Sequence, residues 1–196
     1  STQESADTDL LGRPQIEWLI QGLKASKATW KLIACDMPIG LFVPDGKDAA
    51  GVSRWEAVAN GEHGTPKGRE LEMARLLKGI KDAGVKNVVW LTADVHYTAA
   101  HHYSPERAQF QDFDPFWEFV SGPLNAGTFG PNKADKTFGL EVVYSKASPR
   151  PNAAPSEGYQ FFGQLDIDHR SQALTVTLKD LNGQSLYTQT LEPQRS

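Results

Sequence analysis

Twice along this chain, an amphipathic helix pattern is followed by a short apolar run and then, within two residues, by an aspartate. The helix patterns span residues 12–26 and 69–83, and Gly84 follows the second one as a left-handed C-cap. The apolar runs at residues 30–35 and 87–92 are typical of buried strands. Because helix and strand alternate at this length, the sequence predicts an α/β fold.

Acidic and imidazole side chains follow both predicted strands. Asp36 comes directly after the first, and Pro38 should force a turn there. Asp94 and His96 follow the second strand with one residue between them. In open α/β sheets ligands bind outside the carboxyl ends of strands, so these three side chains form a candidate metal site. Two simpler readings stay open: Asp36 as the cap of a turn, and Asp94 with His96 as a hydrogen-bonded pair.

Composition narrows the class of protein. The chain has 196 residues, 39% of them hydrophobic, and five Trp, which excludes a disordered chain and allows one large domain. No apolar run approaches the roughly 20 residues of a membrane span. The net charge of −4 and the lack of a Lys/Arg cluster argue against nucleic acid and favour a small-molecule partner. The single cysteine, Cys35, excludes an internal disulfide.

The remaining segments differ in character. Residues 1–11 are expected to be a mobile lead-in, and the start at Ser1 suggests a processed product. Residues 40–67 are rich in Gly and Pro, and predict a long irregular loop that is either a surface excursion or a wall or lid of an active site. Residues 121–132 form a glycine-rich loop without the strand and helix context of a dinucleotide site, so they more simply shape a pocket wall.

From residue 140 onward the pattern changes to strands separated by turns. Strands are predicted at 140–144, 159–168, 173–181 and 185–192, with a hairpin turn at Asn182 and Gly183. Asp166, Asp168 and His169, at the end of the second of these strands, are candidate ligands by residue type. Leu165 and Ile167 alternate with the two acids, as on a half-solvated face, so the three polar residues are not read as metal ligands.

Four stretches of the chain, at residues 30–39, 66–71, 90–97 and 116–132, resemble the alkaline phosphatase D family, and the resemblance runs from about residue 11 to the C-terminus. The family is related to the calcineurin-like metallophosphoesterases. The resemblance implies a two-sheet α/β sandwich flanked by helices, with a two-metal centre at the strand ends. It also implies phosphomonoesterase or phosphodiesterase activity with calcium, iron or manganese, and export to the periplasm or beyond.

Three residues carry over to the family's metal positions: Asp36, Asp94 and His96. Carboxylates in place of imidazoles favour hard ions such as calcium, magnesium or manganese over zinc. His101 and His102, predicted to follow a short helical turn, are candidate catalytic residues that would act as a general acid near the leaving group. Their alternative is a surface or structural role.

The family's earlier metal ligands have no counterpart in this sequence. The resemblance therefore implies that residues 12–139 are the C-terminal half of a metallophosphoesterase catalytic domain and that residues 140–196 are a strand-rich part packed on it. The expected partners are a phosphoester substrate and either the missing N-terminal half or a second copy in a homodimer, which would cover the open sheet edge. The alternative function is a structural or assembly fragment that binds no metal.

Overall fold

The computed structural model describes residues 8–194 and is built around a mixed five-stranded sheet. Its strand order is β1-β5-β7-β6-β9, in which β1, β5 and β7 run parallel while β6 is antiparallel to both of its neighbours. The carboxyl ends of β1, β5 and β7 therefore meet at one edge of the sheet. The strand bounds are β1 Lys31–Ala34, β5 Val88–Thr92, β6 Thr98–Tyr103, β7 Phe116–Val120 and β9 Leu140–Lys146.

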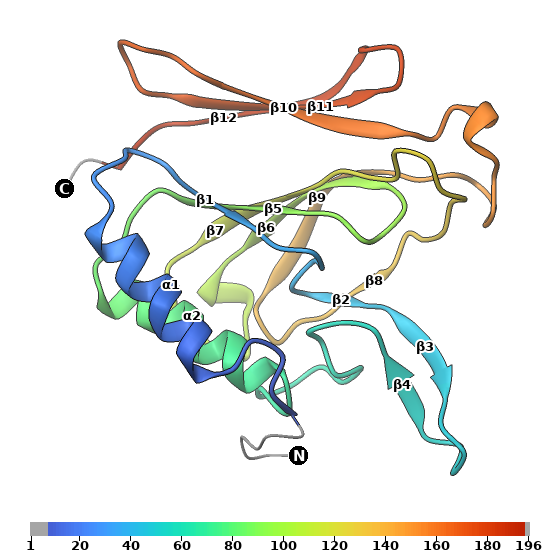
Figure 1. The fold of residues 1–196 in the computed structure, drawn as a ribbon, viewed down its shortest axis with the longest axis horizontal. Helices are drawn as coiled ribbons and strands as arrows, with labels where there is room; N and C mark the ends of the chain where they lie inside the picture. The colour runs from blue at the N-terminus through green and yellow to red at the C-terminus, as the bar shows by residue number, and fades with distance from the viewer. Residues whose placement is uncertain (1–7, 195–196) are drawn as a thin grey trace.

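This sheet is covered on both faces (Figure 1). Helices α1 (Arg13–Ala25) and α2 (Glu70–Asp82) lie on one face. A three-stranded antiparallel sheet lies on the other, formed by β10 (Phe161–Ile167), β11 (Leu174–Asp180) and β12 (Ser185–Leu191). The arrangement confirms the expected α/β class and the expected pair of stacked sheets flanked by helices.

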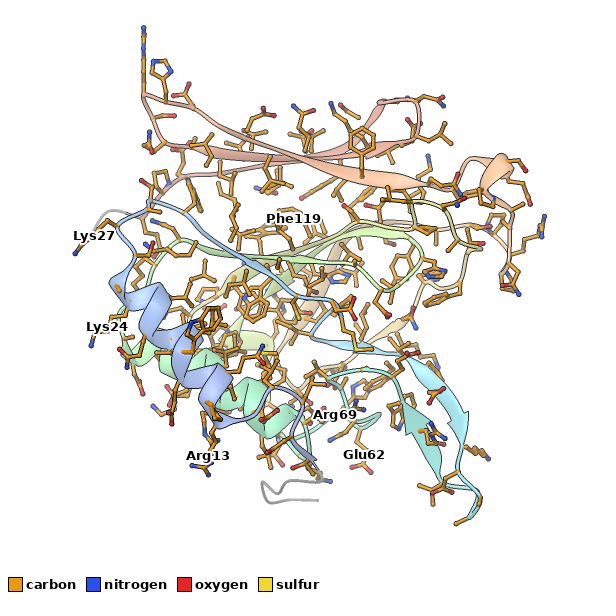
Figure 2. The ribbon with its side chains drawn as sticks, in the orientation of Figure 1. Arg13, Lys24, Lys27, Glu62, Arg69 and Phe119 are labelled. Atoms are coloured by element: carbon orange, nitrogen blue, oxygen red, sulfur yellow. The ribbon has the colours of Figure 1, made fainter. Side chains whose placement is uncertain are left out.

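Two apolar layers hold these elements together. Between the sheets, Phe119 packs with Leu174, Val176 and Leu178 of β11, and Figure 2 labels Phe119 in this layer. Alternate residues of β11 reach the layer because side chains of a strand point to opposite faces in turn. Burying one such Leu or Val contributes on the order of 1.5–3 kcal/mol. A larger layer between the first sheet and the helices includes Trp90 and Leu76.

Most elements predicted from the sequence are present within a few residues of their expected bounds. Gly84 has a φ of 66° after α2, as a left-handed cap requires. Two expectations were wrong. The histidine pair lies inside β6 rather than after a helical turn, and the segment 40–67 contains three short strands. Those strands are β2 (Leu41–Phe42), β3 (Pro44–Lys47) and β4 (Ser53–Trp55).

Short pairings fix that segment beside the main sheet. β2 pairs with β8 (Lys133–Ala134), which follows the glycine-rich loop, and β3 forms a hairpin with β4. Two short 3₁₀ turns, Pro105–Arg107 and Pro155–Glu157, also lie within the described residues. None of the helices within residues 8–194 is both long and apolar enough to cross a membrane.

Two predicted boundaries, the end of the lead-in and the boundary at 139/140, can be compared with the observed elements. The lead-in falls largely on residues 1–7, which lie outside the described residues. Of its remainder, the backbone amides of Leu10 and Leu11 donate hydrogen bonds of 2.6 and 2.8 Å to the buried carboxylate of Glu72. The second division, at 139/140, precedes β9, which pairs with β6 in the five-stranded sheet.

Candidate metal centre

Asp36 and Asp94 lie at the shared carboxyl edge of β1 and β5. The ladder between these strands continues past their ends, because the Cys35 amide donates to the Leu91 carbonyl at 3.0 Å and the Ala93 amide donates to the Asp36 carbonyl at 2.9 Å. Asp36 and Ala93, which are 57 positions apart in the sequence, are thereby hydrogen-bonded through their backbones, and Asp94 directly follows Ala93. The fold brings both predicted aspartates to one place.

Asp94 occupies a strained and negatively charged position. Its φ of 56° is left-handed, a conformation that side chains other than Gly rarely adopt. Burial raises the pKa of its carboxyl group, and the charges of Glu56 and Asp36 raise it further, while His96 acts in the opposite direction. A carboxylate that is half-buried among other carboxylates gains stability from a bound cation.

Glu56 is the residue that sequence reasoning missed. It follows β4, is exposed, and its backbone amide donates to the Val43 carbonyl at 2.9 Å. Its charge acts on Asp94 even though the two lie in different segments. Nothing in the local sequence marks this glutamate, since it stands in an irregular stretch with no metal-ligand spacing. Whether residues 40–67 form a wall or lid of an active site or a surface excursion stays a prediction.

His96 is held by the glycine-rich loop. Its Nδ1 is hydrogen-bonded to the carbonyl of Gly127, and its ring packs against Phe129 with 4.4 Å between ring centroids. With Nδ1–H donated to a carbonyl, Nε2 carries the lone pair, and metal-binding histidines are usually oriented through such a contact. Gly130 lets the loop approach closely, because a Cβ there would lie 2.5 Å from the ring of Tyr97. The loop thus forms a wall beside His96.

These donors fit part of a metal coordination sphere. Asp36 and Asp94 supply hard carboxylate oxygens and His96 supplies one oriented imidazole nitrogen. Within residues 8–194, no three or more His, Cys, Asp or Glu side chains are grouped closely enough to hold an ion. Metal binding by Asp36, Asp94 and His96 therefore stays a prediction.

His101, the first candidate catalytic residue, points into the core. Its side chain is 1% exposed, and its Nδ1 lies 2.7 Å from an oxygen of the fully buried Glu118. The same carboxylate accepts hydrogen bonds from the Tyr103 hydroxyl at 2.8 Å and from the Ile39 amide at 2.9 Å. This buried network ties the segment after Asp36 to the sheet, which favours a structural role for His101.

His102, the second candidate, lies on the opposite face of β6. Its ring is 4.9 Å from that of Trp117, and the guanidinium of Arg107 contacts its Nδ1 at 3.0 Å. Burial and the charge of Arg107 lower the pKa of His102. It pairs with Trp117 three residues before the end of β7 at Val120, roughly 10 Å from the strand ends. A general-acid role for either histidine stays a prediction.

A solved structure of PhoD matches with a TM-score of 0.47 and 19% sequence identity, covering 95% of this chain and 36% of that one. The chain thus spans about a third of the length of that protein. No curated protein sequence matches it. The family model for PhoD-like phosphatases matches residues 1–178, and the chain therefore belongs to the PhoD-like phosphatase family.

Proposed function

We propose that this chain is part of a metal-dependent phosphoester hydrolase in which Asp36, Asp94 and His96 bind metal. Membership of the PhoD-like phosphatase family supports hydrolysis of phosphate esters, either monoesters or diesters. Export to the periplasm or beyond belongs to the same proposal and rests on the family alone.

The observation that carries the proposal is the convergence at the carboxyl edge of β1 and β5. Burial raises the pKa of the Asp94 carboxyl group, and the charges of Glu56 and Asp36 raise it further. Beside them His96 is oriented through its Nδ1 by the Gly127 carbonyl. Like charges of this kind are retained at sites where a ligand compensates them, and the compensating ligand here would be a cation.

The chemistry follows from the donor set. Paired hard cations lower the pKa of water and neutralise phosphate oxygens during in-line displacement. Asp36 and Asp94 would hold such ions, and carboxylate oxygens favour calcium, manganese or iron over zinc. The Gly127 carbonyl keeps the His96 ring in one orientation, and Phe129 packs against that ring.

The remaining ligands would come from a partner at the open edge of the five-stranded sheet. Among the described strands, β1 pairs only with β5, so its other edge offers unpaired backbone groups. Apolar side chains lie exposed beside it, with Leu32 44% and Trp18 71% exposed. An upstream part of the enzyme or a second copy of this chain would cover that edge, and sedimentation of the purified chain distinguishes a monomer from a homodimer.

A structural or assembly fragment that binds no metal is the second candidate. It is favoured by one observation, namely that the described residues contain no group of three or more potential ligands. This candidate predicts that the chain is indifferent to metal ions. A metal titration therefore separates the two candidates directly.

The test is titration calorimetry of the full chain with Ca²⁺ and Mn²⁺, with hydrolysis of bis-p-nitrophenyl phosphate measured on the same samples. We expect binding heat in the wild type and its loss in both Asp94→Ala and His96→Ala. Matched controls are Asp166→Ala and His169→Ala, whose side chains are exposed at the end of β10. No heat in the wild type, or equal loss in the controls, would favour the structural fragment.

A further inference from the structure

A cavity of about 540 Å³ lies at the end of the molecule opposite to the candidate metal centre. It is bounded by the C-terminal ends of α1 and α2, the starts of β1 and β5, the turn between β10 and β11, and residues 193–194. Neither Asp36, Asp94 nor His96 lines it. Its size is in the range of small-molecule sites.

The charged residues of this cavity have one sign. Five cations line it, and no Asp or Glu belongs to its described lining. This reverses the balance of the chain, in which 24 acidic residues outnumber 20 basic ones. The cations come from four separate segments, and Figure 2 labels two of them near the end of α1. They are Lys24, Lys27, Lys31, Lys86 and Arg170.

Ordinary structural causes explain only part of this cluster. Lys24 and Lys27 lie at the C-terminal end of α1, where cations offset the helix dipole. Lys86 pairs with Asp114 at 2.5 Å. Lys31 and Arg170 belong to other elements and have no carboxylate partner within residues 8–194. Lys31 is half-buried at the start of β1.

The floor of the cavity is fixed by contacts between distant segments. Asn87 exchanges two hydrogen bonds with the backbone of Gln194, at 2.7 and 3.1 Å. The carbonyl of Gln172 accepts the Trp30 indole N–H at 2.7 Å. Asn87 and Gln172 both have left-handed backbones, with φ of 60° and 63°. Strain of this kind persists where the surrounding structure holds it in place, often at binding sites.

We infer that this cavity binds a small soluble polyanion that carries at least two phosphate groups, such as pyrophosphate. The cations that line the cavity supply charged hydrogen-bond donors for phosphate oxygens. The lining contains no aromatic residue, so it offers no surface on which a nucleobase would stack. A ligand with two phosphates contacts more of the dispersed cations than a single phosphate does. The site is separate from the proposed metal centre and does not depend on it.

The experiment is titration calorimetry of the full chain with pyrophosphate and, in parallel, inorganic phosphate, at low ionic strength with EDTA present so that metal-bound anion is excluded. We expect saturable binding of pyrophosphate that is tighter than that of phosphate. The double variant Lys31→Gln/Arg170→Gln should bind pyrophosphate at least about tenfold more weakly, because two charge-assisted contacts are lost.

A matched control removes the same charge elsewhere. Lys47→Gln/Lys136→Gln changes two exposed lysines outside the cavity lining and should leave the affinity within about twofold. Asp94→Ala should likewise bind pyrophosphate as the wild type does. Absence of saturable binding, equal weakening in the control pair, or loss of binding in Asp94→Ala would each overturn the inference. Circular dichroism melts of all variants verify that they are folded.

Discussion

The two ends of the five-stranded sheet carry opposite charges and are built from different parts. At the carboxyl ends of the parallel strands, the charges of Asp36, Glu56 and His96 all act on Asp94. At the opposite end, lysines and an arginine surround a cavity with no described acidic lining. The acidic end is walled by irregular segments, whereas the basic end is bounded by helix and strand termini.

The comparison shows that both ends combine like charges with left-handed backbones. Like charges cluster at each end, and three of the four non-glycine residues with left-handed backbones among the described residues are found there, namely Asp94, Asn87 and Gln172. The fourth, Asn152, packs against Gly127, whose carbonyl holds His96. Such concentration of strain and charge is typical of binding sites.

The largest effect is expected from the buried network that separates the two ends. Glu118→Ala leaves His101, Tyr103 and the Ile39 amide without their shared acceptor, and should lower the free energy of unfolding by about 3–5 kcal/mol. Because Ile39 follows Asp36 closely, the variant should also lose metal binding while it retains pyrophosphate binding. Urea denaturation and the two titrations measure these effects.

Two further variants sharpen that prediction. Glu118→Gln keeps an oxygen acceptor for the Ile39 amide and should cost less than Glu118→Ala. Glu192→Ala changes an exposed glutamate after β12 and should stay within about 0.5 kcal/mol of the wild type. If Glu118→Ala lost binding at both ends alike, the network would support the whole fold rather than the acidic end.

The next effect concerns pH and the carboxylate of Glu70 at the start of α2. Burial, and secondarily the charge of Asp135, raise the pKa of Glu70 from 4.5 to about 7. The folded protein then holds this proton more tightly than the unfolded chain, so its contribution to stability is complete below pH 4.5 and is lost as pH rises towards 7. The loss amounts to at most about 3 kcal/mol.

Glu70→Gln isolates this contribution, because glutamine does not titrate and still offers an acceptor to the Asn60 amide, which Glu70 contacts at 2.9 Å. Free energies of unfolding measured from pH 4.5 to 7.5 should fall less steeply in Glu70→Gln than in the wild type. Glu17→Gln, an exposed change on α1, should leave the slope as it is. Parallel slopes in wild type and Glu70→Gln would show that Glu70 titrates normally in the folded protein.

The smallest expected change in stability comes from replacing one left-handed residue at each end of the sheet by glycine. Asp94→Gly relieves a left-handed backbone and removes a carboxylate crowded by Glu56 and Asp36, so it should raise stability by about 1 kcal/mol and abolish metal binding. Gln172→Gly relieves a similar backbone but loses side-chain hydrogen bonds to Thr29 and to the His169 carbonyl. Its gain should therefore be smaller. Thermal melts of both variants check the order, and a loss of stability in Asp94→Gly would contradict it.

The sequence predicted the elements well because their signals are local. The 3.6-residue apolar periodicity gave α1 and α2, and Gly84 marked the end of α2. Unbroken apolar runs gave β1 and β5, and alternation with turn residues gave β10 to β12. The wrong expectations fell where local signals are weak: two-residue and three-residue strands such as β2 and β4 exist only because a distant segment or a hairpin partner pairs with them.

For the candidate site, the sequence by itself determined that Asp36, Asp94 and His96 follow strand ends, since strand propensity and the carboxyl-end rule act over a few residues. Only the tertiary structure decided that Glu56 joins them and that His101 turns to a buried Glu118. It alone also gathered cations from four segments into one cavity. The physical reason is that electrostatic interactions and burial depend on distances through space, which local sequence does not encode.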